Sequence, residues 1–177
     1  MAVNGDARQL LQRWSPPFDQ RELREEALAL ISSEAALWRE GAPAHLTASA
    51  VVLDRSGRQV LLVHHAKSGK WQFPGGHCER NDASLEAAAR REVREATGLA
   101  VGLMTLLALD GGPTMCGPSA RRHIDVRFVA IVSQDAPRVS SESLDVGWLG
   151  SRICQPLIDQ ISESTWISLF GEAMALA

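Results

Sequence analysis

The stretch WQFPGGHCERNDASLEAAARREVREATGL, residues 71–99, decides how the rest of the chain is organised. It runs from a strand end through a Pro-Gly-Gly turn and an acidic loop into a helix rich in glutamates. Pro74 fixes φ and removes a backbone donor, while Gly75 and Gly76 allow another part of the chain to approach closely. Five acidic residues follow in this stretch: Glu79, Asp82, Glu86, Glu92 and Glu95. Hard divalent cations such as Mg²⁺ prefer oxygen-rich clusters of this kind.

The predicted helix has an apolar face and an acidic edge. On a helical wheel at about 100° per residue, four apolar residues share the face that we expect to pack on a sheet: Leu85, Ala89, Val93 and Ala96. Glu92 and Glu95 lie beside each other at the edge of this face. A solvated helix with i,i+4 ion pairs such as Arg91–Glu95 would use the same charges. The Pro-Gly-Gly turn and the acidic loop favour a cation site instead.

Length and composition limit the classes of protein to which this chain can belong. The chain has 177 residues, 45% of them hydrophobic, which suits one domain with a packed core and an extension. The net charge of -3 argues against binding to extended nucleic acid, which usually goes with a basic surplus. No apolar run is long enough to span a membrane, and the first residues lack a signal-peptide pattern. The cysteines at 78, 116 and 154 fit no C-x-x-C metal site. We therefore expect a cytoplasmic protein.

Residues 1–44 are predicted to form a helical extension. A short helix is expected over residues 6–14, and a longer one is expected to run to Trp38 and to end before Gly41 and Pro43. Two signals mark the start of the longer helix, a capping box and a hydrophobic staple: Asp19 with Glu22, and Phe18 with Leu23. The apolar stripe of this extension is expected to pack on the main domain or on a second subunit, so a homodimer is one hypothesis.

Residues 45–177 are predicted to form the main domain. Alternating or β-branched runs indicate five strands, the first two joined as a hairpin: 46–53, 59–65, 101–109, 122–132 and 145–149. A loop is expected over residues 110–120, and a helical pattern over residues 153–175 closes the chain. Strands around a central helix, with a second helix at the end, predict an α/β/α sandwich with a mixed sheet.

From Gly76 onward, and above all in REVREATGL at residues 91–99, the chain resembles the Nudix box. That box is glycine, five residues, glutamate, seven residues, then R-E-apolar-x-E-E-x-G-apolar. The hairpin, the W-x-x-P-G-G run and a late strand ending in Trp148 are also similar to the family, so the resemblance covers about residues 45–150. It implies the Nudix-type fold and hydrolysis of the pyrophosphate bond in a nucleoside diphosphate linked to another moiety. It also implies Mg²⁺ or Mn²⁺ as cofactor.

Two positions depart from the box. Asp82 stands where the first glutamate is expected, and eight residues rather than seven separate it from Arg91. An Asp82–Arg91 ion pair, together with Gly75 and Gly76, is expected to brace this longer loop. Ala96 replaces the second glutamate of the E-E pair, which is commonly a principal metal ligand in the family. This loss should weaken cation binding, and it keeps open a second hypothesis, a Nudix-fold nucleotide-binding or regulatory module without efficient turnover.

The resemblance implies metal-assisted attack of water, with a carboxylate as the base. The expected metal ligands are Glu92, Glu95 and the loop residue Glu79. The candidate catalytic bases are Glu92 and Glu142, because family members often place a base or a further ligand on the late loop that contains Glu142. An ordinary surface position for Glu142 is an equally good interpretation.

Three residues are candidates for binding the substrate. Lys70 precedes the Gly-Gly turn and could contact phosphate, and Trp71 could stack on a base or pack in the core. Arg127 could hold a phosphate through bidentate donors, or it could be a solvated charge near a strand end. His123 and Asp125 alternate with an apolar residue on the same strand, so they face either the substrate cleft or a structural environment.

Overall fold

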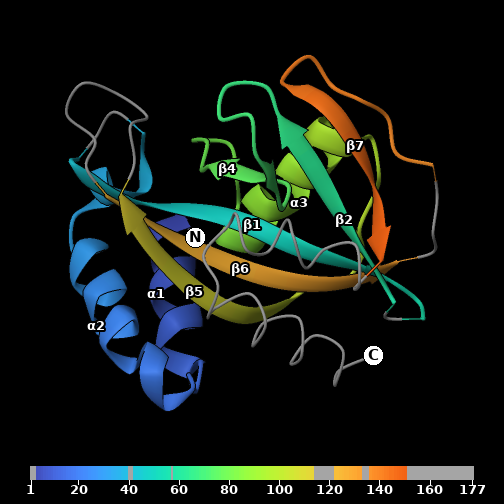
Figure 1. Ribbon diagram of the computed structural model, residues 1–177. Helices are drawn as coiled ribbons and strands as arrows, with labels where there is room; N and C mark the ends of the chain where they lie inside the picture. Colours follow the sequence, from blue (N-terminus) through green and yellow to red (C-terminus); the bar gives the residue numbers. More distant parts are fainter. Residues whose placement is uncertain (1–2, 40–41, 57, 114–121, 133–135, 151–177) are drawn as a thin grey trace.

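The structure, a computed structural model, describes residues 3–39, 42–56, 58–113, 122–132 and 136–150. Along these residues, helical segments come first, followed by a run of strands, a central helix and a second run of strands; Figure 1 labels the longer elements. Their order is α1 (Val3–Arg13), η1 (Phe18–Gln20), α2 (Arg21–Leu30), η2 (Glu34–Leu37), β1 (Ala44–Asp54), β2 (Gln59–His65), β3 (Trp71–Gln72), β4 (Gly75–His77), α3 (Leu85–Thr97), β5 (Thr105–Pro113), β6 (Arg122–Val132) and β7 (Ser143–Gly150).

The strands form one mixed sheet, as the sequence predicts, in the order β3-β2-β1-β6-β5. β1 and β6 are parallel over their full lengths, from Ala44 opposite Arg122 to Asp54 opposite Val132, and the other pairs are antiparallel. β1 has different partners along its other edge, because it pairs with β2 at its end and with β4 nearer its start. β2 therefore diverges from β1 and pairs with β3 and β7.

The two faces of β1 have different environments. Alternate residues from Leu46 to Val52 are fully buried in the larger core, which also contains the apolar faces of α1 and α3. On the opposite face, Val51 and Leu53 join a smaller apolar cluster near the hairpin. The start of that second face is polar but still buried, with three residues spaced two apart: His45, Thr47 and Ser49. This polar end lies beside β4, the strand that pairs with Thr47, Ala48 and Ser49.

The central helix α3 has the caps expected from its sequence. The Ser84 side chain accepts a hydrogen bond of 2.9 Å from the N–H of Ala87, and Gly98 ends the helix at a φ of 72° that favours glycine. The predicted inner face is buried at three of its four positions, while Ala96 is only half-buried. Thr97 is buried at the end of the helix instead, where its hydroxyl donates to the carbonyl of Val93 at 2.6 Å.

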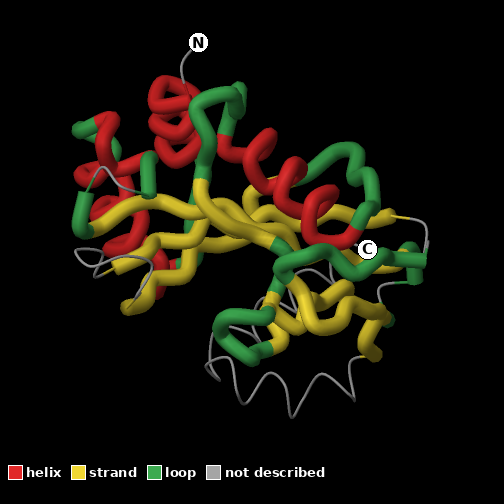
Figure 2. The backbone as a smooth tube through the Cα atoms, turned by 90° about the horizontal axis from the view of Figure 1, so that it is seen from above, coloured by secondary structure: helices red, strands yellow, loops and turns green. Residues whose placement is uncertain are grey.

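The N-terminal extension packs on the main domain of its own chain. Figure 2 shows α1 and α3 on the same side of the sheet, and the buried face of α1 belongs to the larger core. The Asp6 carboxylate accepts from the N–H of Leu85 at 3.2 Å, and the Gln20 side chain accepts from the N–H of Leu109 at 2.8 Å. The apolar stripe is thus used within the chain and supplies no argument for the homodimer, which stays a prediction.

The predicted start and end of the second helix are wrong. Asp19 lies in the short η1 turn, the N-cap of α2 is Gln20, and neither position makes a side-chain cap bond. Phe18 is 83% exposed, so the staple is absent. α2 ends at Leu30, because the hydroxyl of Ser32 donates to a helix carbonyl at 2.7 Å and competes with the backbone.

The strand predicted over residues 101–109 begins four residues later, at Thr105. Arg90 of α3 donates to the carbonyls of Val101 and Gly102, which ties this segment to the helix and away from the sheet. The strand then continues to Pro113, through part of the predicted loop, because it pairs with β6 along that length. The helix predicted over residues 153–175 lies outside the described residues. Among the described helices, none has the length and apolar character that a membrane crossing requires.

Candidate active site

The two glycines predicted as a turn lie instead in the short strand β4, because they pair with β1, and this strand contacts both β1 and α3. Gly75 and Gly76 lie opposite Ser49 and Ala48 in the β1–β4 ladder. A Cβ on Gly75 would lie 2.4 Å from the Cβ of Ser49, so no side chain fits between these strands. A Cβ on Gly76 would lie 2.5 Å from the Oε1 of Glu92. The Glu92 carboxylate therefore occupies the space that a side chain at residue 76 would need.

Arg91 links α3 to the acidic loop. Its guanidinium donates to both carboxylate oxygens of Asp82, at 3.1 and 3.0 Å, and to the main-chain carbonyl of His77 at 2.8 Å. Asp82 in turn accepts from the N–H of Glu79 at 2.7 Å. The Arg91 and Asp82 side chains are only 12% and 7% exposed. The ion pair expected across the lengthened loop is present, and its contribution to activity stays a prediction.

Three further carboxylates converge on the Nη1 atom of the same Arg91. The distances are 2.9 Å to Oε1 of Glu92, 3.1 Å to Oε2 of Glu95 and 3.9 Å to Oε1 of Glu79. These are the three residues that the sequence predicts as metal ligands. The structure thus brings them together around the guanidinium of Arg91, and metal binding by them stays a prediction.

The electrostatics of this group differ between its members. Burial raises the pKa of Glu92, the bond and charge of Arg91 oppose that rise, and the charges of Glu95 and Glu142 add to it. Burial disfavours the charge on Arg91, but its bonds to Asp82 and Glu92 raise its pKa well above the ordinary value. Arg91 therefore stays charged at every relevant pH. The ionised form of Glu92 is disfavoured by burial, and additional positive charge nearby would stabilise that form.

The donor atoms are of the type that a hard divalent cation takes. All three converging side chains offer carboxylate oxygens, the ligand type that Mg²⁺ and Mn²⁺ prefer. Gly76 leaves the space in which the Glu92 carboxylate lies, and a residue with a Cβ would displace it. Ala96 is half-buried one residue beyond Glu95 and contributes no oxygen. Mg²⁺ commonly takes few protein carboxylates and completes its shell with water and phosphate, so this smaller set is still compatible with it.

The remaining predicted site residues lie around this cluster. The exposed Glu142 is close enough for its charge to act on Glu92, and its backbone carbonyl accepts from the N–H of Ala66 at 2.9 Å. Lys70 is exposed in the loop before β3. The half-buried Trp71 ring stacks on His64, with centroids 5.2 Å apart and an interplanar angle of 12°, and packs against the smaller core. Catalysis by Glu142 and substrate binding by Lys70 and Trp71 stay predictions.

Arg127 is buried and paired, which excludes the solvated strand-end interpretation. Its guanidinium forms ion pairs with Asp125, at 3.0 Å, and with Asp110 of β5. Asp125 also accepts from the hydroxyls of Thr47 at 2.8 Å and Ser49 at 2.5 Å. Asp125 thus belongs to a buried network that joins β1, β5 and β6. A substrate contact by Arg127 stays a prediction, and it would have to involve a guanidinium already held by two carboxylates.

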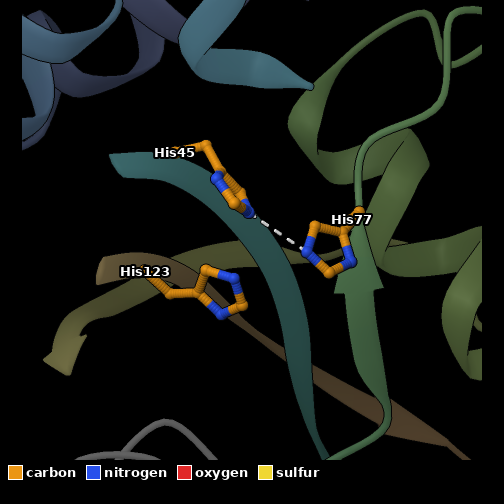
Figure 3. Close-up of side chains that lie close together, drawn as sticks. All are labelled: His45, His77 and His123. Atoms are coloured by element: carbon orange, nitrogen blue, oxygen red, sulfur yellow. Dashed lines mark hydrogen bonds between the residues drawn. The ribbon is translucent and has the colours of Figure 1, made fainter. Parts of the chain in front are cut away.

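Sequence reasoning missed a group of three histidines on β1, β4 and β6. His45 and His123 lie directly opposite each other in the parallel ladder, and the side chain of His77 extends toward both (Figure 3). The ring centroids are 4.6 to 5.1 Å apart, and the Nε2 atoms of His45 and His77 are 3.1 Å apart. The available signal was weak: His45 and His123 are each the second residue of their strand, but the pairing of those strands had to be known.

Burial lowers the pKa of all three histidines. Desolvation is the largest cause in each case. Together with the charges of neighbouring histidines, it lowers the pKa of His77 and of His123 to about 4. These imidazoles are therefore neutral at pH 7, the form in which histidine binds metal ions.

Comparison with known proteins places the site in context. The sequence profile of the NUDIX domain matches residues 43–152. A curated nudix hydrolase of Caenorhabditis elegans is 39% identical over 67 residues, which are 35% of this chain and 18% of that protein. The chain thus matches less than a fifth of that relative's length.

Two solved structures are similar at low identity. The NUDIX domain of Shewanella oneidensis NrtR, complexed with ADP ribose, is 24% identical with a TM-score of 0.55, covering 63% of this chain and 76% of that one. The Escherichia coli dihydroneopterin triphosphate pyrophosphohydrolase is 16% identical with a TM-score of 0.59, covering 75% of this chain and 96% of that one. At these identities the likeness shows the fold, and it agrees with the predicted mixed sheet with helices.

Proposed function

Because the chain belongs to the NUDIX domain family, we propose that it hydrolyses the pyrophosphate bond of a nucleoside diphosphate linked to another moiety, using Mg²⁺ or Mn²⁺. The family supports hydrolysis of a pyrophosphate-type substrate. The observation that carries the finer proposal is the convergence of Glu79, Glu92 and Glu95 on Arg91, with the Glu92 carboxylate lying against Gly76.

In this proposal Glu79, Glu92 and Glu95 hold the cation. When bound, the ion neutralises the diphosphate and lowers the pKa of a bound water. Arg91 sets the position of the carboxylates, because it contacts one oxygen of Glu92 and one of Glu95 while a bidentate pair anchors it to Asp82. The loop and the helix are thereby held in one arrangement before any ligand binds.

Glu92 is the preferred proton acceptor. It is the most buried carboxylate of the three, at 18% exposed, and burial raises its pKa toward the working range of a general base. Glu142 is the second candidate, since its charge acts on Glu92 from the late loop. Of the two, Glu142 is exposed, so it is better placed to assist a ligand than to replace Glu92 as the buried base.

The substrate class is supported by the chemistry of two similar proteins. One neighbour binds ADP ribose and another is a pyrophosphohydrolase of dihydroneopterin triphosphate, and both ligands contain linked phosphates. In this chain Lys70 offers an exposed ammonium group for phosphate, and Trp71 offers a ring beside the same turn. Arg127 would act as a fixed positive charge in the sheet, held in place by Asp110 and Asp125.

The test is an assay of the purified chain with Mg²⁺ or Mn²⁺ on ADP-ribose, dinucleoside polyphosphates, dihydroneopterin triphosphate and nucleoside triphosphates. Products are separated by chromatography and identified by ³¹P NMR. We expect turnover on at least one compound and a loss of about 10²-fold or more in Glu92→Gln. Glu86→Gln is the matched control, because Glu86 lies on the same helix but pairs with Arg90. Formation of phosphate-containing cleavage products no greater than that with Glu92→Gln would overturn the proposal.

Ala96 keeps open the second hypothesis, a module that binds a nucleotide without efficient turnover. If the chain binds one of these compounds without cleaving it, the nucleotide-binding or regulatory hypothesis replaces the hydrolase. Ala96→Glu restores the carboxylate of the Nudix box, and we expect it to tighten Mn²⁺ binding in a titration. An unchanged affinity would mean that residue 96 does not face the cation.

A further inference from the structure

The three histidines on β1, β4 and β6 have the composition and placement of a metal site. One ligand nitrogen from each of His45, His77 and His123 lies within 4.8 Å of the others. The rings come from three separate strands, and Figure 3 shows them gathered around a common region. We propose that they form a binding site for a divalent transition-metal ion such as Zn²⁺, distinct from the carboxylate cluster on α3.

The hydrogen bond behind His45 supports this assignment. Its Nδ1 lies 3.2 Å from the main-chain carbonyl of Ala42. A carbonyl oxygen can only accept, so Nδ1 carries the proton and Nε2 presents its lone pair toward His77. Histidines that bind metals typically donate their second ring nitrogen to a carbonyl or carboxylate in this way, which fixes both tautomer and orientation.

The spacing of the donors is close to that of a tetrahedral ion. Two imidazole nitrogens bound to one Zn²⁺ at about 2.0–2.1 Å lie about 3.3–3.4 Å apart. In the metal-free chain the Nε2 of His77 donates to the Nε2 of His45 across 3.1 Å, so metal binding would move this proton to the Nδ1 of His77 and separate the two nitrogens only slightly. No two of the three ligand nitrogens are more than 4.8 Å apart. To reach the spacing around one ion, the most distant pair would have to approach by at most about 1–1.5 Å, which rotation of an imidazole ring can supply.

The chemistry of the donors selects a different ion from the one expected at α3. Neutral imidazole nitrogens suit Zn²⁺, Cu²⁺, Ni²⁺ and Co²⁺, whereas carboxylate oxygens suit Mg²⁺ and Mn²⁺. Three protein ligands would leave a fourth position for water or an anion. The two sites adjoin at one residue, because the carbonyl of His77 accepts from Arg91 while its imidazole joins the histidine cluster.

Calorimetric titration of the full chain tests the proposal. The protein is treated with chelator, dialysed, and titrated with ZnCl₂ in excess Mg²⁺, which occupies the carboxylate cluster but competes weakly for imidazole. We expect one Zn²⁺ per chain and at least a hundredfold loss of affinity in His123→Gln. His65→Gln is the matched control, because His65 lies outside the cluster, and it should bind like the unmodified chain. Equal affinity in His123→Gln, or displacement of Zn²⁺ by Mg²⁺, would overturn the proposal.

A second measurement needs no variant and so does not depend on folding of a mutant. Imidazole ¹⁵N resonances of the unmodified chain are recorded with and without Zn²⁺, and His64 and His65 serve as internal references. We expect the signals of His45, His77 and His123 to shift together, at one equivalent. Unmoved signals from these three would refute the site. Either result leaves the proposed hydrolysis intact, because that rests on the carboxylates of α3.

Discussion

The two clusters that meet at β4 are built in different ways. The acidic cluster comes from residues 79–95, one loop and one helix, and a single guanidinium contacts all four of its carboxylates. The histidine cluster comes from three strands, and two of its members are 78 residues apart in sequence. The first is charged and oxygen-rich, and the second is neutral and nitrogen-rich.

This difference shows how one short strand, β4, can serve two kinds of site. The backbone of β4 is bound on one edge to β1, and the carbonyl of His77 accepts from Arg91 of α3. Changes in the acidic cluster should therefore alter charge balance and oxygen-ligand binding. Changes in the histidine cluster should alter binding of transition metals. Variants in each cluster test whether the two clusters act independently.

Arg91→Ala should have the largest effect on stability. It leaves the almost buried Asp82 without its partner and exposes three other carboxylates to one another. Removing one member of a buried pair typically costs about 3–5 kcal/mol of unfolding free energy. Urea denaturation measures the loss, and Arg94→Ala, on the exposed side of the same helix, should change stability by less than about 0.5 kcal/mol. Equal losses in the two variants would show that Arg91 does not organise the acidic cluster.

Gly76→Ala should affect activity more than folding. The new methyl group would lie 2.5 Å from the end of the flexible Glu92 side chain, which can move aside. Misplacing a catalytic carboxylate by about 1 Å can cost about 10²-fold in rate. Gly75→Ala is the contrasting variant, because its methyl would meet the backbone of Ser49 at 2.7 Å and should destabilise the sheet. Steady-state kinetics and thermal melts of both variants separate the two effects, and full activity in Gly76→Ala would refute the position assigned to Glu92.

Glu92→Gln should separate the ion preferences of the two clusters. We expect its Mn²⁺ affinity, followed by electron paramagnetic resonance, to fall about tenfold, or about 1.4 kcal/mol. Its Zn²⁺ affinity in excess Mg²⁺ should stay unchanged, because no histidine is altered. A parallel loss of both affinities would mean that the clusters form one site.

The same Glu92→Gln variant should be slightly more stable than the unmodified chain at pH 7 without metal. Burial raises the folded-state pKa of Glu92, so its contribution favours folding at low pH and is lost as pH rises through that pKa. Glutamine removes this cost and keeps an oxygen that can accept from Arg91, so a gain below about 1 kcal/mol is expected. Chemical denaturation between pH 4 and pH 8 should show a gain that grows with pH. A variant that is less stable at pH 7 would contradict the sign of this effect.

The parts predicted well from sequence depend on contacts between near neighbours. The course of α3, the end of this helix at Gly98 and the Asp82–Arg91 pair follow from spacings that one turn or one loop determines. The predicted mixed sheet also agrees with the structure. The capping box at Asp19 failed because Asp19 lies inside the η1 turn, which moves the N-cap of α2 to Gln20.

By itself, the sequence determined the family, the acidic stretch and the central helix, because local spacing and backbone chemistry specify them. Only the tertiary structure decided the rest. β1 pairs with β6 in a register that places His45 opposite His123. Arg127 is buried between the carboxylates of Asp110 and Asp125. Asp6 accepts a hydrogen bond from the N–H of Leu85, in the first turn of α3. These contacts join residues far apart in the chain, so they depend on strand register and packing, which no short motif records.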